Sequence, residues 1–326
     1  MRTLLILCAG SRQINHLPIC LNIHPDGKLL AEKAIEGIYV ESYDRVVYVI
    51  TTSMDERYNA GEILLSRINR SVEVVCISED TNGPADTVFY ALKAANITGE
   101  FAVRDCLDSI SISKSVSGNF VVGLDLTRYD QDVYKVRTKS FIIINEQNQI
   151  LDIVEKRFRS DLISVGLYGF KSTKDFFTAY EKLKDPNYSI EKLYLSNIIS
   201  YLIGYNQRIF HYVPTMKFED WGSVETWNQL QRKYATCIID ADGILGAVLT
   251  ENKLDEIADI IARNSKAYMS YVVMTSGEVK QENALKKLTD KGINCVGFIS
   301  GISQSNRKVI ISDEEELQHY SLEKLP

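Results

Sequence analysis

Strand-like apolar runs alternate with amphipathic segments along the whole chain, and this alternation most limits what the chain can fold into. Between the runs, apolar residues recur at helical spacing in residues 28–41, 60–68 and 87–95. Such an alternation indicates an α/β protein with a mainly parallel sheet. The strand-like runs are residues 3–8, 46–50, 72–77, 119–122, 141–144, 236–239, 271–274 and 296–299.

Two regions depart from this rhythm. Residues 139–156 predict two antiparallel strands joined by a turn of Asn and Gln residues, and a further strand follows at 163–170. Near residue 232 a helix-like segment runs directly into a new strand. At 326 residues the length favours two domains, and we expect them at 1–232 and 233–326. Ligands bind beyond the carboxyl ends of the strands in such sheets, so the residues that follow each strand are the candidates for a site.

Composition and charge exclude several classes of protein. A hydrophobic share of 45% and a charged share of 25% are those of an ordinary globular protein, which excludes disorder. The net charge of −6 argues against nucleic acid as a partner. No run approaches the roughly 18 apolar residues of a membrane span. The cysteines form no Cys-x-x-Cys pair. We therefore expect a cytoplasmic protein with neither a nucleic-acid nor a membrane partner.

Short polar and Gly-containing motifs punctuate the first 232 residues. None is specific alone, because Gly-containing turns between strands and helices are common. In an α/β sheet all of them can converge on one edge, and their order along the chain is far more specific than any member. The motifs are Ala9-Gly10-Ser11-Arg12, Gly83-Pro84-Ala85-Asp86-Thr87, Asp105, Glu155-Lys156, Gly166-Leu167-Tyr168-Gly169-Phe170 and Asp220-Trp221-Gly222-Ser223.

This ordered set resembles the nucleotidyltransferases that activate sugar phosphates, over about residues 1–232. It is most similar to the branch associated with bacterial capsule polysaccharide genes. The resemblance implies a Rossmann-like domain of the GT-A type with a mixed sheet. It also implies that a sugar 1-phosphate or similar phosphomonoester attacks the α-phosphorus of a nucleoside triphosphate and releases pyrophosphate. The implied cofactor is Mg²⁺, because such chemistry needs positioning and charge neutralisation.

The same resemblance implies roles for individual residues. Asp105 and Asp220 hold the metal ion, and Arg12 stabilises the leaving pyrophosphate. Nucleotide-binding residues are Ala9, Gly10, Ser11, Gly83, Pro84, Ala85 and Thr87, and residues that bind the acceptor are Glu155, Lys156 and Gly166. The residue types alone leave other interpretations open: Asp105 as a turn cap, Asp220 as a helix N-cap, and Glu155-Lys156 as an exposed ion pair.

Three positions depart from the pattern of that family. Gly10 is followed almost at once by Arg12, so fewer backbone N–H groups are available to a triphosphate. Ile19 stands where the family has a lysine. After Asp105, the related branch has a second Asp two residues on, whereas this chain has Leu107 and then Asp108. These departures keep both an active and a degenerate nucleotidyltransferase open.

The C-terminal part carries a second set of chemical residues. Asp240 and Asp242 follow the run at 236–239, and two carboxylates two residues apart beyond a strand suit a nucleophile and a proton carrier. Thr275 follows the run at 271–274. With the later basic and acidic residues, this order resembles the haloacid dehalogenase-like (HAD) phosphatases over about residues 235–320, in a small Rossmannoid form without a cap.

That second resemblance implies a phosphatase site. Asp240 is the nucleophile and Asp242 the general acid/base, while Thr275 binds the phosphoryl group. Arg307 or Lys308 supplies the cation, and Mg²⁺ is held by Asp240, Asp242 and Asp313. Ile244 stands where the family usually has Thr, and a domain that kept the fold and lost the activity remains the alternative.

Together these patterns favour a bifunctional or partly degenerate enzyme that makes a nucleotide-linked precursor of a surface polysaccharide. Its partners are then a nucleoside triphosphate and a phosphorylated small molecule. Two alternatives stay open: a phosphatase whose N-terminal domain only binds ligand, and a non-catalytic regulatory or assembly protein. Tyr194, Tyr201 and Tyr205 lie on a helix-like stretch and fit either a core or a subunit interface, so a homo-oligomer is also open.

Overall fold

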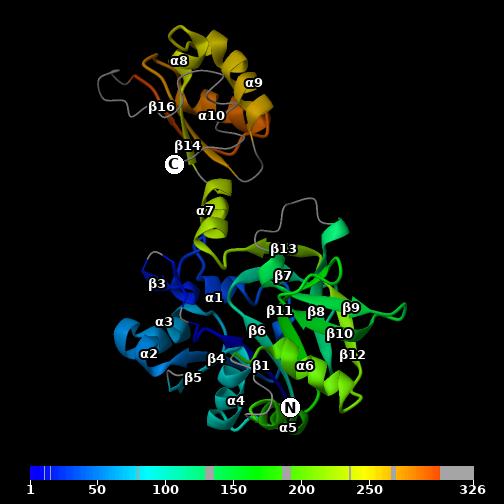
Figure 1. Cartoon of the computed structure of the whole chain (residues 1–326). Helices are drawn as coiled ribbons and strands as arrows, with labels where there is room; N and C mark the ends of the chain where they lie inside the picture. The colour runs from blue at the N-terminus through cyan, green and yellow to red at the C-terminus, as the bar shows by residue number, and fades with distance from the viewer. Residues whose placement is uncertain are drawn as a thin grey trace. The chain divides into compact units, whose positions relative to one another are not determined.

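The computed structural model describes residues 1–301 except residues 11, 15, 79–80, 129–135, 186–191, 235 and 266–268. The predicted site residues Ser11, Arg307, Lys308 and Asp313 lie outside the described residues. The chain divides into two compact units, Met1–Trp227 and Asn228–Pro326 (Figure 1). The division falls inside helix α7 (Val224–Lys233), a few residues before the expected boundary.

Four parallel strands form one half of the large sheet in the first unit. They lie in the order β5-β4-β1-β6, and β1 and β4 are buried along nearly their whole length. Continuous burial is expected of parallel strands that helices cover on both faces. Leu7 pairs with Asp105, so the carboxyl ends of β1 and β6 lie side by side. The bounds are β1 (Arg2–Leu7), β4 (Arg45–Thr51), β5 (Glu73–Ile77) and β6 (Glu100–Asp105).

The other half of this nine-stranded sheet is mixed. Its order continues from β6 as β11-β8-β12-β10-β9, and only β12 and β8 among these neighbours run parallel. The predicted hairpin is confirmed as β9 and β10, whose turn is closed by the Asn145 side chain accepting from the N–H groups of Gln147 and Gln149. The bounds are β8 (Phe120–Asp125), β9 (Ser140–Ile144), β10 (Gln149–Glu155), β11 (Leu162–Phe170) and β12 (Phe210–Pro214).

The last strand of the order folds back onto the sheet. In addition to β10, β9 pairs with β11, with Phe141 opposite Ile163. Strands β11, β8, β12, β10 and β9 therefore close into a ring. Two short pairs complete the unit, β7 (Asp108–Ser111) with β13 (Lys217–Asp220), and β2 (Gln13–Ile14) with β3 (Leu17–Pro18).

Helices cover both faces of the sheet. Alternate residues of a strand point to opposite faces, so Leu4 and Ile6 pack with α1, α2 and α3 while Leu5 packs with α4, α5 and α6 (Figure 1). No helix in the described part of the chain is both long and apolar enough to traverse a lipid bilayer. The bounds are α1 (Leu30–Lys33), α2 (Thr52–Tyr58), α3 (Ala60–Arg67), α4 (Pro84–Ala94), α5 (Thr173–Leu183) and α6 (Leu195–Gly204).

The predicted helix at 28–41 is mostly wrong. Only α1, four residues long, is helical, and a short 3₁₀ turn (Val40–Ser42) follows later. Gly37 has a φ of +76°, and a Cβ there would lie 2.7 Å from the carbonyl oxygen of Ile110. The chain turns at Gly37 because it must approach the backbone of β7 closely, and the apolar spacing did not encode that approach.

The second unit contains a parallel sheet of three strands in the order β14-β15-β16. Its core includes Ile239 from β14, Val273 from β15 and Ile257 and Ile261 from α9. These strands confirm the runs predicted at 236–239, 271–274 and 296–299. The bounds are β14 (Thr236–Asp240), α8 (Ala241–Leu245), α9 (Leu254–Asn264), β15 (Ser270–Met274), α10 (Gln281–Asp290) and β16 (Cys295–Ile299).

Candidate active site

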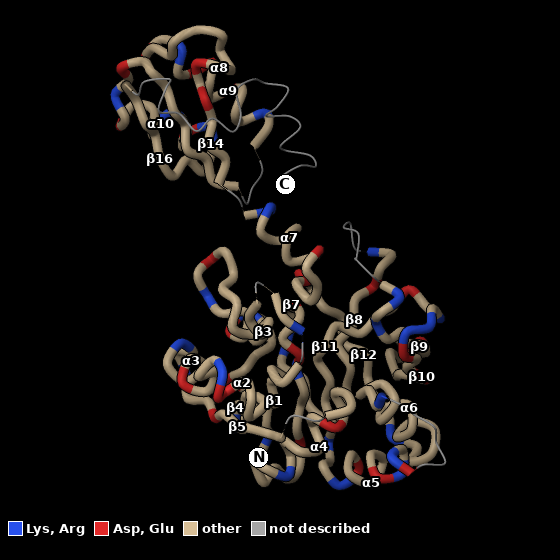
Figure 2. Tube along the Cα trace, turned by 60° about the vertical axis from the view of Figure 1, so that its left-hand side comes forward, with Lys and Arg blue, Asp and Glu red and all other residues tan. Residues whose placement is uncertain are grey.

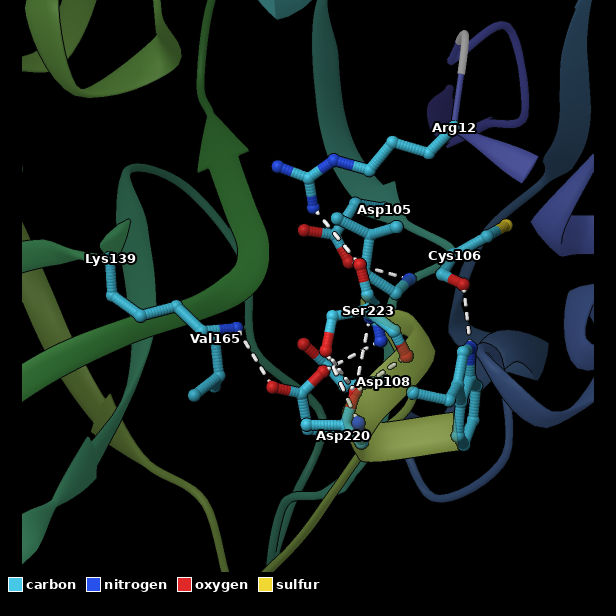
Figure 3. A network of polar contacts seen from close by, with 12 residues as sticks. Arg12, Asp105, Cys106, Asp108, Lys139, Val165, Asp220 and Ser223 are labelled. Atoms are coloured by element: carbon cyan, nitrogen blue, oxygen red, sulfur yellow. Dashed lines mark hydrogen bonds and ion pairs between the residues drawn. The ribbon is translucent and has the colours of Figure 1, made fainter. Parts of the chain in front are cut away.

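Asp105 and Asp220 lie at the same edge of the large sheet (Figure 3). Asp105 is the last residue of β6, and Asp220 is the last residue of β13. Because β13 pairs antiparallel with β7, Asp220 lies opposite Asp108, three residues after Asp105. Residues more than one hundred positions apart in the chain therefore lie at the same edge.

The segment after β13 is held against the turn after β6. Trp221 is fully buried, and its indole Nε1 donates to the carbonyl oxygen of Cys106 at 2.7 Å. Its backbone N–H donates to the carbonyl oxygen of Leu107 at 3.0 Å. The N–H of Leu107 in turn donates to the Asp105 carboxylate at 3.2 Å. These bonds fix Asp105 in a turn of defined shape, so its capping role and its place at the site coexist.

Gly166 makes room for the Asp105 carboxylate. Its φ is +73°, and a Cβ built on it would lie 2.2 Å from Oδ2 of Asp105. The register of β11 breaks between Ser164 and Tyr168, so the glycine sits in an irregular part of the strand. No side chain other than hydrogen fits there, which explains this glycine by its contact with Asp105.

A buried arginine contacts two of the carboxylates and the backbone around them. Arg104 is 0% exposed, and its Nη2 lies 2.7 Å from Oδ1 of Asp108, which is 1% exposed. Its Nε donates to the carbonyl oxygen of Ala34 at 2.7 Å and its Nη1 to that of Val165 at 2.9 Å. The same Nη1 lies 3.4 Å from Asp105. One guanidinium thus links the backbone at Ala34 and at Val165 to the carboxylates of Asp105 and Asp108.

A lysine contacts the site from the position just before β9. Nζ of Lys139 lies 3.7 Å from Oδ2 of Asp220, and the lysine side chain is only 17% exposed (Figure 3). Burial by itself lowers the pKa of the Lys139 ammonium, but the charges of Asp220, Asp108 and Asp105 outweigh it and raise that pKa. Lys139 is therefore charged at neutral pH.

Burial raises the pKa of the Asp108 carboxyl, and the charges of Asp105 and Asp220 act in the same direction. Arg104 and Lys139 oppose this shift. The arrangement is thus a compact group of three carboxylates and two cations whose protonation states depend on one another.

Arg12 reaches the same place from the turn after β1. Its Nη1 donates to the carbonyl oxygen of Gly222 at 3.1 Å, two residues after Asp220. Ala9 is half-buried, and a Cβ at the exposed Gly10 would meet no atom within 4 Å. The predicted loop therefore brings Arg12 to the Asp220 segment and leaves open space at Gly10.

The predicted nucleotide-binding turn lies at the start of α4. Gly83 has a φ of +125°, and a Cβ there would lie 2.5 Å from the carbonyl oxygen of Leu193. Pro84 starts the helix, and the N–H of Ala85 donates to that same carbonyl. Thr87 is buried, and its hydroxyl lies 3.0 Å from that of Thr81. Ala85 and Thr87 thus anchor the turn through contacts inside the protein.

Glu155 and Lys156 are more than an exposed ion pair. Glu155 ends β10, and its Oε2 accepts hydrogen bonds from the hydroxyls of Ser140 and Ser196. Nζ of Lys156 lies 4.1 Å from the ring centre of Tyr194 and donates to its hydroxyl. The glutamate is fixed by the fold, while the lysine lies at the surface of the same corner.

The donor set fits a magnesium ion that binds together with substrate. Among the described residues, no group of three or more His, Cys, Asp or Glu side chains is arranged to hold a metal ion. Mg²⁺ is usually bound by one or two carboxylates plus the phosphate oxygens of a substrate. Asp105 and Asp220, 34% and 15% exposed, supply two such carboxylates.

In the second unit, Asp242 is engaged by four hydrogen bonds. Its Oδ1 accepts from the N–H of Leu249 at 2.9 Å and from the hydroxyl of Thr275. Its Oδ2 accepts from the N–H of Ser276 at 2.8 Å and from the Ser276 hydroxyl. Thr275 is 0% exposed, so its hydroxyl is directed to Asp242. Asp240 ends β14 and is 8% exposed.

These bonds set the ionisation of Asp242. Burial by itself raises the pKa of its carboxyl, but the hydrogen bonds from Ser276, Thr275 and Leu249 outweigh it and hold that pKa well below its usual range. A carboxylate held in this way gives up its charge with difficulty, which disfavours the predicted role of general acid.

We expect Asp242→Asn to destabilise the second unit by about 1–3 kcal/mol, because the amide nitrogen must face one of the backbone N–H groups that the carboxylate now accepts. The wild-type contribution is present above the ordinary pKa of about 4 and is lost as pH falls below it, since the folded-state pKa is depressed. Hydrogen exchange of β14 and β15 in the full chain, measured between pH 3 and 7, checks both points.

Asp259→Asn is the matched control, because Asp259 is 52% exposed and pairs only with Lys291 in the ion pairs of the described residues. It should change exchange in β14 and β15 by less than the equivalent of about 0.5 kcal/mol. An equal effect of the two substitutions would show that the hydrogen bonds of Asp242 contribute no special stability.

Three residues of the first site were not singled out from the sequence. Arg104 stands between the short apolar run at 101–103 and Asp105, Asp108 was noted only as a departure from the family pattern, and Lys139 only as the start of a hairpin. The one signal that was available for Arg104 is its position between apolar residues and Asp105, because a charged residue is buried only with a partner.

No protein-family profile and no curated protein sequence matches the chain. Solved structures do match. A nucleoside-diphosphate-sugar pyrophosphorylase from Vibrio cholerae RC9 is 17% identical with a TM-score of 0.58, over 71% of this chain and 100% of that chain. An inositol-1-phosphate CTP transferase from T. maritima is 15% identical with a TM-score of 0.54, over 71% and 96%.

A UDP-glucose pyrophosphorylase complexed with UDP-glucose is 18% identical with a TM-score of 0.54, over 72% of this chain and 98% of that chain. Each match spans nearly the whole of the other protein, while about 29% of this chain extends beyond it. The mixed α/β fold is therefore that of the sugar-phosphate nucleotidyltransferases.

Proposed function

We propose that the first unit is a nucleotidyltransferase. It transfers a nucleoside monophosphate from a nucleoside triphosphate to a sugar 1-phosphate or similar phosphomonoester, and pyrophosphate leaves. The observation that carries this proposal is the meeting of Asp105, Asp220 and Arg12 at the carboxyl edge of the sheet, in a fold shared with pyrophosphorylases. Opposite charges at one open edge suit phosphate chemistry.

Each residue then has a task that its surroundings permit. Arg12 lies beside Gly222, where its guanidinium stabilises the negative charge of the leaving pyrophosphate. Gly10 leaves space for the triphosphate to approach the backbone. The turn at Gly83 to Thr87 is rigid, and it positions the base and ribose by shape.

The acceptor binds at the corner formed by Glu155, Lys156 and Gly166. Glu155 is held by Ser140 and Ser196, which suits a carboxylate that accepts hydrogen bonds from sugar hydroxyls. Lys156 supplies a cation for the acceptor phosphate. Gly166 keeps Asp105 accessible between the two substrates.

Magnesium is the cofactor of this proposal, with Asp105 and Asp220 as its protein ligands. When bound, Mg²⁺ supplies Lewis-acid neutralisation of phosphate charge. Hydrogen bonds from Trp221 and Leu107 fix the turn that carries Asp105, so its carboxylate is positioned before the ion binds.

The pathway belongs to the same proposal. The ordered motifs are most similar to the capsule polysaccharide branch, so the product is a nucleotide-linked precursor of a surface polysaccharide. A supply of nucleoside triphosphate places the reaction in the cytoplasm.

For the second unit we propose a HAD-like domain without phosphatase turnover. The strand order β14-β15-β16 with Asp240 at the end of β14 supports the likeness. Asp242 and Thr275 bind each other, which leaves neither ready for a phosphoryl group. The alternative is an active phosphatase in which Asp240 is the nucleophile and Asp242 exchanges its partners during the reaction.

The test measures pyrophosphate and phosphate release with Mg²⁺, across the four common nucleoside triphosphates and a panel of sugar 1-phosphates and other phosphomonoesters. We expect pyrophosphate release that requires one specific pair of substrates. We expect no phosphate release from the monoesters, either in wild type or in Asp240→Asn. Phosphate release that Asp240→Asn abolishes would instead make the second unit a phosphatase, and silence in both channels would contradict the transferase.

Gly166→Ala should lower pyrophosphate release at least tenfold. The added Cβ would lie 2.2 Å from Oδ2 of Asp105, so the carboxylate must move away from its place in the site. The positive φ adds about 1–2 kcal/mol of strain. Gly118→Ala is a matched control, since Gly118 has a φ of +78° but its Cβ would meet nothing within 4 Å. Rates and thermal melts of both variants separate the two effects. Equal losses of activity would rule out the contact with Asp105 as the cause.

A further inference from the structure

Lys139 is held in contact with a predicted metal ligand by residues on both sides of it. Its ammonium lies 3.7 Å from Oδ2 of Asp220 and 5.4 Å from the ring centre of Phe218, two residues earlier in β13. Residues two apart in a strand share a face, so β13 presents an anion and an aromatic ring to the same cation. The carbonyl oxygen of Lys139 accepts from the N–H of Lys156 at 3.1 Å, which fixes the backbone as well.

The charges around Lys139 balance without any bound ion. Asp105, Asp108 and Asp220 act on its ammonium from the negative side, and Arg12 acts from the positive side. Arg104 is paired with Asp108 and lies near Asp105. When all six side chains are charged, these three carboxylates and three basic side chains sum to zero. A divalent cation by itself would add two uncompensated positive charges at a poorly solvated place.

We propose that Lys139 is an internal counter-cation of Asp220 that opposes divalent-cation binding until substrate phosphates arrive. Its ammonium stands within ion-pair distance of the oxygen that a magnesium ion would use. A nucleoside triphosphate brings enough negative charge to admit the divalent cation and to give the displaced ammonium a new partner. The proposal rests on the proposed function only for the identity of that phosphate ligand.

Two consequences follow for binding. The free protein holds a divalent cation weakly, although two carboxylates lie at its site. The cation and the triphosphate then bind cooperatively, because each supplies the charge that the other needs. Lys139 thus keeps a divalent cation from occupying the site in the absence of nucleotide. Two aspartates without a neighbouring lysine would not prevent such binding.

The test titrates the full-length protein with Mn²⁺ and follows free Mn²⁺ by electron paramagnetic resonance, with no nucleotide present. We expect Lys139→Met to bind Mn²⁺ at least about tenfold more tightly than wild type, because a unit charge about 4 Å from a ligand is removed. Lys217→Met is the matched control: Lys217 is exposed on the same strand as Asp220, and its loss should change the affinity less than about twofold.

A double variant shows whether the gain arises at Asp220. In an Asp220→Asn background, Lys139→Met should no longer tighten Mn²⁺ binding. Lys139→Gln, which keeps a polar head, provides a second neutral variant in case Lys139→Met fails to fold in thermal melts. Mn²⁺ affinity that is equal in wild type and in a folded neutral variant overturns the proposal, as does a gain that persists without Asp220.

A second measurement adds the non-hydrolysable α,β-methylene analogue of the nucleotide that supports pyrophosphate release. The analogue should tighten Mn²⁺ binding more in wild type than in Lys139→Met, and an equal effect would overturn the cooperative part of the proposal. The first titration needs no nucleotide. A Mn²⁺ gain in a protein that releases no pyrophosphate therefore contradicts the proposed function and not the role of Lys139.

Discussion

Asp105→Asn should reduce pyrophosphate release by about 10²–10³-fold, the loss typical when one electrostatic contact to a developing charge is removed. Asparagine has the same shape, so it retains an acceptor for the N–H of Leu107 and fits against Gly166. The negative charge disappears while the turn remains. Initial rates with the best substrate pair, together with a thermal melt within about 2 °C of wild type, measure the effect on chemistry alone.

Asp44→Asn provides the comparison for that variant. Asp44 is 60% exposed and lies just before β4, at the amino edge of the same sheet, where it accepts from the N–H of Arg2. Its substitution removes one carboxylate from the first unit at a place remote from the site, so the rate should stay within about twofold of wild type. An Asp105→Asn enzyme that is as active as Asp44→Asn would refute the role of Asp105.

Arg104→Met should destabilise the first unit by about 3–5 kcal/mol, because it leaves the Asp108 carboxylate buried without its main partner. The carbonyl groups of Ala34 and Val165 lose their donor as well. Both tryptophans of the chain, Trp221 and Trp227, belong to the first unit. Urea unfolding followed by tryptophan fluorescence therefore reports this unit selectively.

The double variant Arg104→Met/Asp108→Leu tests the cause of that loss. Removing both charges eliminates the uncompensated carboxylate, so the double variant should be more stable than Arg104→Met by about 2 kcal/mol. If it is no more stable, then the lost carbonyl contacts, rather than the buried charge, hold this part of the fold together. Arg104→Lys keeps a positive charge but loses the forked geometry of the guanidinium. Its stability should lie between those of wild type and Arg104→Met.

The fold was predictable where local patterns decide it. The alternation of apolar runs and helical spacing identified β1, β4 and β5 and the three strands of the second unit, and the Asn-rich turn identified the β9–β10 hairpin. The helix at 28–41 was mispredicted because its end is set by the backbone of β7, which is distant in sequence from Gly37. Lys and Arg residues are interspersed with Asp and Glu residues over the first unit (Figure 2).

The sequence singled out Arg12, Asp105, Asp220 and Gly166, but not the charged residues that surround them. Asp105 follows a short apolar run that is visible in the sequence, whereas Asp220 was singled out only through the family resemblance and its strand β13 is seen in the structure. The partnership of Lys139 with Asp220 spans 81 positions and depends on β9 folding back onto β11, a closure that no local pattern contains. Arg104 and Asp108 are near neighbours, but their burial follows from the turn into β7.

The ring closure also reduces the number of open edges of the nine-stranded sheet. Because β9 is satisfied by both β10 and β11, the nine-stranded sheet has one open side among the described residues, at β5. The open edge of such a strand is a template on which a second chain can add its own strand and begin an aggregate. That side of the sheet begins with Glu73, whose carboxylate is bonded to Arg45 and half exposed. A charge on an edge strand protects against such pairing, so we expect Glu73→Val to promote fibre formation through the β5 edge of the large sheet.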